Sequence, residues 1–90
     1  MTETIEIRRK RLLFRSWHRG TKEADLLFGS FAEAHLAGFD ADQVAVYERL
    51  MEAEDPDLWD WVTGHAPPPP EYDTDVLALV RTFRYRPRSA

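Results

Sequence analysis

The residues best suited to chemistry stand in one turn near position 20. Arg19, Gly20 and Glu23 follow an Arg-Gly-x-x-Glu order. Arginine donates two parallel hydrogen bonds to a carboxylate, glutamate accepts them, and glycine lets another backbone approach closely. The turn therefore holds the ingredients of a docking site. Helix capping explains the same residues: Arg19 would complement the end of one helix, Gly20 would end it in a left-handed conformation, and Glu23 would suit the start of the next.

Patterns typical of catalysis and metal binding are missing from the sequence. The histidines, His18, His35 and His65, are too far apart for a His-x-x-x-His metal pair. No serine stands in a nucleophile elbow, and there is no glycine-rich phosphate loop. The chain has no cysteine, which excludes disulfides and thiolate nucleophiles. We therefore expect no enzymatic activity, no catalytic residue, no metal and no cofactor bound by the chain itself.

Helical periodicity predicts the elements that must position this turn. We expect five helices, at about 5–17, 22–37, 40–54, 55–63 and 73–83, and no strand. A chain of 90 residues can build one modest core. The predicted fold is therefore all-α, a compact five-helix bundle that forms a single small domain over residues 1–90, with the bundle at about 5–86 and flexible termini.

Four side chains are expected to cap the starts of these helices: Thr21, Asp40, Asp55 and Asp73. Asp40 should form a capping box with Gln43, three residues later. Such local rules predict where each helix begins.

Apolar spacing predicts the core. The expected inward positions are Leu13 and Trp17 in the first helix, Ala24, Leu27, Phe28, Phe31 and Ala34 in the second, and Val44, Tyr47, Leu50 and Met51 in the third. Trp59 and Trp61 cannot share a helix face, so one should be buried and the other partly exposed. The four prolines at 67–70 predict an extended spacer before the last helix.

Charge divides the chain into three parts. Residues 1–22 carry a net charge of +5, residues 23–75 carry −13 and residues 76–90 carry +4, which gives −4 overall. The basic first helix leaves open an alternative function, a small helical nucleic-acid-binding or regulatory module. The acidic total argues against it, and a basic helix packed beside an acidic bundle is the simpler interpretation. The sequence has no apolar run of membrane-spanning length and no secretory signal at its start, so we expect a soluble protein of a reducing cytosol, with no membrane insertion.

The stretch Arg-Ser-Trp-His-Arg-Gly-Thr-Lys-Glu-Ala-Asp-Leu-Leu, at 15–27, resembles the small flavin assembly factors of succinate dehydrogenase, whose hallmark is Arg-Gly-x-x-Glu. A second match follows at 47–61, where family members commonly carry a Leu-Leu-Glu run and an Asp-Pro-Asp-Leu run followed by an aromatic residue. The resemblance covers about residues 7–84. His18 stands where many members have another arginine, and the proline run is richer than the family's usual loop.

The resemblance implies an all-α chaperone that binds the flavoprotein subunit of succinate dehydrogenase, an enzyme of the tricarboxylic acid cycle, and often that of fumarate reductase. It implies that the factor promotes covalent attachment of FAD to a histidine of that subunit by holding one arrangement of its domains. The flavin and the flavoprotein would supply the chemistry. The factor would be a monomer of the bacterial cytosol. A stand-alone flavin-binding protein is a further alternative.

By motif match, Arg19, Gly20 and Glu23 would carry the docking to the flavoprotein. Arg19 would pair with acidic or carbonyl groups of the subunit, Gly20 would permit close approach, and Glu23 would accept hydrogen bonds. Weaker candidates for the same surface are His18, Asp25, Asp57 and Trp59.

Overall fold

The computed structural model describes residues 4–83. Its elements are α1 (Ile5–Trp17), α2 (Lys22–His35), α3 (Ala41–Met51), α4 (Asp55–Thr63) and α5 (Asp75–Thr82), with 3₁₀ turns at Leu36–Gly38 and Pro70–Tyr72. No strand occurs within 4–83. The predicted all-α, five-helix fold is confirmed. The predicted end of the bundle near residue 86 lies outside the described residues.

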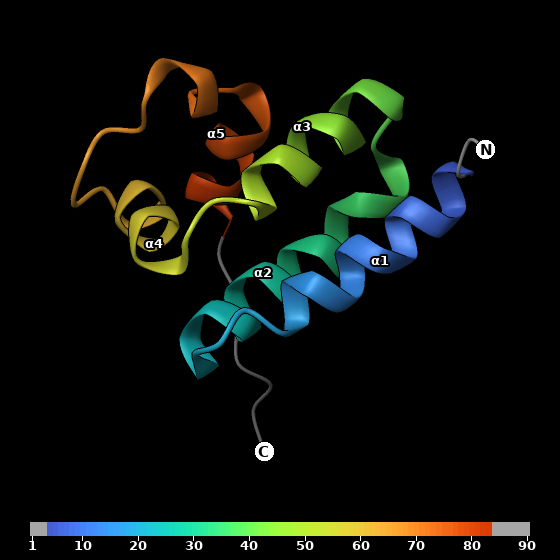
Figure 1. The fold of residues 1–90 in the computed structure, drawn as a ribbon, viewed down its shortest axis with the longest axis horizontal. Coiled ribbons are helices and arrows are strands. Elements are labelled where there is room, and N and C mark those ends of the chain that lie inside the picture. The colour runs from blue at the N-terminus through green and yellow to red at the C-terminus, as the bar shows by residue number, and fades with distance from the viewer. Residues whose placement is uncertain (1–3, 84–90) are drawn as a thin grey trace.

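α1 and α2 form a tightly packed pair, and the other three helices pack onto it one after another. α1 and α2 run antiparallel, side by side, and α3 packs against α1 (Figure 1). α5 packs against both α3 and α4, so α3 and α5 connect the first pair to α4. The loop between α1 and α2 consequently lies at the same end of the molecule as the α3–α4 connection. None of the described helices has both the length and the apolar character needed to span a bilayer.

Capping bonds account for most helix starts. The side chain of Thr21 accepts from the backbone N–H of Ala24, and Asp40 forms the predicted capping box with Gln43. The prediction for Asp73 is wrong, because the hydroxyl of the next residue, Thr74, accepts the capping bond of α5.

The prediction that Asp55 is an N-cap is also wrong. Glu54 occupies the N-cap position of α4 without a side-chain hydrogen bond, and Asp55 is the first helical residue. The carboxylate of Asp55 forms an ion pair with Arg19 instead. Gly64 ends α4 with a φ of +83°, the left-handed conformation expected of a terminal glycine.

The predicted core is confirmed except at four positions. In α1 the buried apolar residue is Leu12, whereas the predicted Leu13 and Trp17 are only half-buried, as is Leu27 in α2. Ala34 is exposed, because ten residues of helix rotate it well away from the stripe that begins at Ala24. All four expected residues of α3 are buried. Trp61 is buried against Tyr72, with ring centroids 4.9 Å apart, and Trp59 is half-buried, as expected.

Gly29 lets α1 and α2 approach closely next to the loop that joins them. A Cβ atom at Gly29 would lie 2.0 Å from the ring of Trp17. Only a glycine therefore allows the indole to lie on the backbone of α2. Because Trp17 is the last residue of α1, this contact helps to set where the following loop begins.

The proline spacer is only partly extended. Pro69 has φ −60° and ψ 154°, which is polyproline II geometry, whereas Pro70 opens the 3₁₀ turn that ends at Tyr72. The spacer and this turn connect α4 to α5.

Candidate functional site

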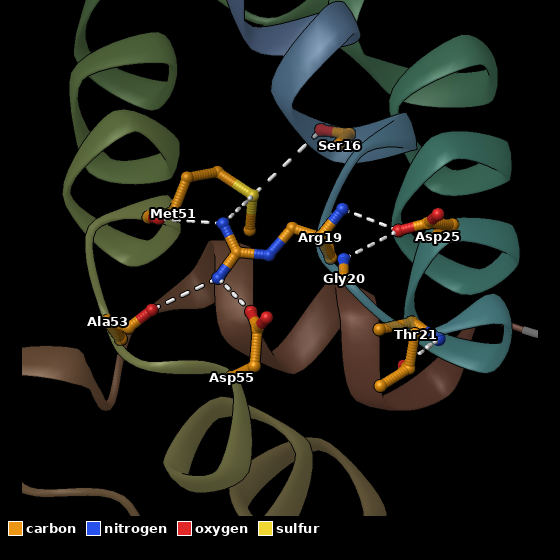
Figure 2. Close-up of polar contacts among 9 residues, drawn as sticks. Ser16, Arg19, Gly20, Thr21, Asp25, Met51, Ala53 and Asp55 are labelled. Atoms are coloured by element: carbon orange, nitrogen blue, oxygen red, sulfur yellow. Dashed lines mark hydrogen bonds and ion pairs between the residues drawn. The ribbon is translucent and has the colours of Figure 1, made fainter.

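The side chain of Arg19 turns into the protein. Its guanidinium donates to the carbonyl oxygens of Met51, at 2.8 Å, and Ala53, at 3.0 Å, and pairs with Asp55 at 2.6 Å (Figure 2). The Arg19 side chain is only 9% exposed. Met51 is the last residue of α3 and Ala53 lies just beyond it, so the guanidinium is at a helix C-terminus, where a cation is favoured. The prediction that Arg19 complements the C-terminal end of α1 is therefore wrong, because Arg19 complements the end of α3 instead. The electrostatic reason, a cation at a helix C-terminus, is the expected one.

Asp25 shapes the loop that carries Arg19. Its Oδ1 accepts from the backbone N–H groups of Arg19 and, at 3.1 Å, of Gly20 (Figure 2). Gly20 has a φ of +121°, which L-residues rarely adopt, so the expected positive φ is confirmed. The C-cap of α1 is His18, two residues earlier. The loop is thus held on the α2 side by Asp25 and on the α3–α4 side by Arg19.

A buried hydrogen-bonded pair lies in the core, just before the loop that carries Arg19. Ser16, which is fully buried, donates through Oγ to the carbonyl of Leu12 at 2.7 Å, and lies 2.6 Å from the hydroxyl of Tyr47. Because the serine proton is committed to Leu12, the phenol donates to Ser16. Burial raises the pKa of Tyr47, which keeps that proton in place. The pair fixes α1 to α3 one turn before Arg19.

A hollow of about 310 Å³ opens between the start of α2 and α4. Its lining residues are Thr21, Glu23, Ala24, Asp55, Pro56 and Trp59. Glu23 is exposed and Trp59 half-buried, so two sequence-predicted residues that are far apart in the chain share one surface. Asp55 belongs both to this hollow and to the ion pair with Arg19.

The other predicted residues lie elsewhere around the loop. His18, Gly20 and Asp25 line a wider depression on the α1 side, of about 570 Å³, where the His18 ring stacks on Phe14 with centroids 4.0 Å apart. Asp57 is exposed on α4 and lines neither hollow. The structure thus gathers six of the seven predicted residues at the loop or along the two hollows beside it.

Sequence reasoning missed the internal partners of the loop. Nothing local indicates that Arg19 reaches Met51 and Ala53, because they lie more than 30 residues further along the chain. Gly29 did carry a usable signal. A lone glycine inside a helical pattern costs stability and usually has a packing reason.

Some of the basic residues of α1 form hydrogen bonds or ion pairs within the protein. Arg8 forms two hydrogen bonds with the carboxylate of Glu48, at 2.6 and 3.1 Å, and Arg9 donates to the carbonyl of Phe39. These contacts fit a basic helix packed beside an acidic bundle and do not favour the nucleic-acid alternative. Within residues 4–83, no group of three or more metal-ligating side chains could hold an ion.

Comparisons with known proteins place this geometry in a family. The family model described as "Flavinator of succinate dehydrogenase" matches residues 10–84. "Succinate dehydrogenase assembly factor 2, mitochondrial" of Drosophila grimshawi is 41% identical over 81 residues, which cover 88% of this chain and 55% of the relative. "Succinate dehydrogenase assembly factor 2-A, mitochondrial" of Drosophila mojavensis is 43% identical over 81 residues, with 88% and 52% covered. The chain spans about half the length of these curated relatives. It belongs to the family of succinate dehydrogenase flavinators.

Proposed function

We propose that the chain is an assembly factor that binds the flavoprotein subunit of succinate dehydrogenase and promotes covalent attachment of FAD to that subunit. One observation carries this proposal beyond family membership. The two stretches that resemble the family meet in space, because Arg19 pairs with Asp55 at 2.6 Å and Glu23 lines the same hollow as Trp59. Two motifs that share one exposed site are expected of a docking surface.

The proposed role needs binding and no catalytic group. Gly20, Glu23 and Trp59 face outward or are half-exposed, and they would contact the subunit. Arg19 and Asp25 hold the loop that presents them, so their contribution to docking would be indirect. By holding one arrangement of the subunit's domains, the factor would align the reacting flavin and histidine. The flavin and the flavoprotein would supply the bond-forming chemistry.

Three narrower expectations belong to the same proposal. They are the flavoprotein of fumarate reductase as a second client, a monomeric state, and the bacterial cytosol as the compartment. The curated relatives are named mitochondrial, so the compartment of this chain stays a prediction.

In-gel flavin fluorescence tests the proposal directly. Extracts of the host, with and without the gene, are denatured and separated, and covalently bound flavin is read at the position of the flavoprotein subunit. We expect the band to be lost without the gene and restored by the wild type but not by Glu23→Ala. The matched control is Asp42→Ala. Asp42 is also an exposed acid at the second position of its helix, α3, and lies away from the hollow.

Two results would count against the proposal. An unchanged band without the gene would mean that flavin attachment does not require this factor. Loss of rescue by both Glu23→Ala and Asp42→Ala would mean that removal of a helix-start charge, rather than a docking contact, explains the effect. Heparin retention with a steep salt dependence would then be the test of the nucleic-acid alternative.

A further inference from the structure

We propose that the hollow between α2 and α4 receives an arginine side chain of the partner protein. The inference rests on the proposed function for the source of that arginine, but its chemistry comes from the hollow itself. The lining combines an aromatic wall, Trp59, with two aliphatic residues, Ala24 and Pro56, and places the carboxylates of Glu23 and Asp55 beside them.

The two carboxylates of the lining have acceptor oxygens to spare. Oγ1 of Thr21 accepts the capping bond from the backbone N–H of Ala24, and Oδ1 of Asp55 is paired with Arg19. Among the described residues, the side chain of Glu23 and Oδ2 of Asp55 have no hydrogen-bond partner. These free oxygens favour a guest rich in donors, and a guanidinium has five donors and no acceptor.

The surrounding charge favours a cation. Arg19 offsets Asp55, which leaves the charge of Glu23 uncompensated within the hollow. The residues that flank the start of α4, Glu54 and Asp57, are exposed acids. Both carboxylates of the hollow lie in first turns, at α2 and α4, and already complement those helix starts. A second anion is therefore disfavoured there.

The shape of the hollow favours arginine over lysine. A volume of about 310 Å³ has room for one long side chain. The flat guanidinium can stack on Trp59 and pair with a carboxylate through two parallel bonds, whereas the ammonium of lysine is a strongly hydrated point charge. The aliphatic stem of the guest would lie along Ala24 and Pro56.

The test uses small probes, so that it does not depend on the flavoprotein. The full chain, labelled with ¹⁵N, is titrated with acetyl-arginine amide while the indole N–H signal of Trp59 is followed. We expect saturable shifts of that signal and of the Glu23 and Ala24 amides. Glu23→Gln should weaken binding of the probe by about three- to fivefold, the scale of an exposed charge pair. Asp42→Asn, the matched control, should leave it unchanged.

Competing occupants give distinguishable results. Equal shifts with acetyl-norleucine amide would show that the hollow recognises only an apolar stem, and equal shifts with acetyl-lysine amide would show that it does not select a guanidinium. Stronger binding of acetyl-glutamate amide would show an anion site. Each of these, or the absence of any shift at Trp59, would overturn the proposal. The fluorescence experiment reports separately on the proposed function, so either can fail alone.

Discussion

The inner and outer sides of the α1–α2 loop use neighbouring residues for opposite purposes. On the inner side, Arg19 is buried and meets two carbonyl oxygens and the carboxylate of Asp55. On the outer side, Glu23 is exposed and, among the described residues, its carboxylate has no partner. An Arg-Gly-x-x-Glu order therefore does not describe a single surface. Part of the motif builds the loop, and part of it is displayed by the loop.

The difference teaches how a short motif can combine stability and recognition. A docking residue must keep its position without using its own polar groups, and the neighbouring residues can supply that position. The bonds of Arg19 and Asp25 to the loop and its surroundings do this for Gly20 and Glu23. Substitutions on the inner side should therefore change stability first, and substitutions on the outer side should change binding first.

The largest effect is expected for Arg19→Ala. The change removes a half-buried ion pair, in which Asp55 is 34% exposed, and leaves two carbonyl oxygens without their donor. Mainly because of these two carbonyls, the free energy of unfolding should fall by about 2–4 kcal/mol. Urea denaturation measures this free energy. Arg19→Lys should recover only part of it, because one ammonium cannot reproduce the fork that reaches Met51 and Ala53 together. A urea midpoint of Arg19→Ala equal to that of the wild type would show that the inner side of the loop does not stabilise the protein.

Gly29→Ala tests whether the loop depends on the close packing beneath it. A Cβ atom there would overlap the ring of Trp17 at 2.0 Å, so we expect a loss of about 1–3 kcal/mol and displacement of the indole. Thermal unfolding and the assigned indole N–H signal of Trp17 in a ¹⁵N-labelled sample are the readouts. Gly38→Ala is the control, because a Cβ at Gly38 meets nothing within 4 Å and its φ is not positive. Equal effects of the two changes would show that the packing contact is unimportant.

Gly20→Ala lies at the boundary between the two sides. The φ of +121° should make the change cost about 1–2 kcal/mol. Gly64→Ala imposes the same kind of strain at a φ of +83° where nothing lies nearby, whereas a Cβ at Gly20 would lie 3.2 Å from Oδ2 of Asp55. Any excess loss at Gly20 therefore combines its contact with Asp55 and the greater strain of its larger φ. If Gly20→Ala costs less than Gly64→Ala, Asp55 adjusts freely and does not restrict the loop.

The smallest effect on stability is expected for Glu23→Ala. Loss of an exposed acid from a helix start should cost about 0.3–1 kcal/mol, and Asp42→Ala should cost a similar amount. Affinity for the flavoprotein subunit, measured by titration calorimetry, should fall only for Glu23→Ala. A parallel fall for both variants would remove the distinction between the two sides of the loop.

Local rules predicted the fold well and the site in part. Helix starts at Thr21 and Asp40 follow from capping bonds that span three residues, so they can be read from adjacent positions. The same rules misplaced the start of the fifth helix by one residue, at Asp73, because the neighbouring Thr74 competes for the same role. For Asp55 a distant partner decided the outcome, because the ion pair with Arg19 occupies the carboxylate.

The sequence by itself determined the five helices, the buried face of α3 and the identity of the residues in the motif, because periodicity and capping act within one or two turns of chain. Only the tertiary structure decided that Arg19 points inward while Glu23 points outward. The partners of Arg19 lie at the end of α3, in the connection after it and at the start of α4, more than 30 residues away. They reach the loop only after the core has brought these helices together. A buried guanidinium needs acceptors, and the carbonyls of Met51 and Ala53 supply two of them.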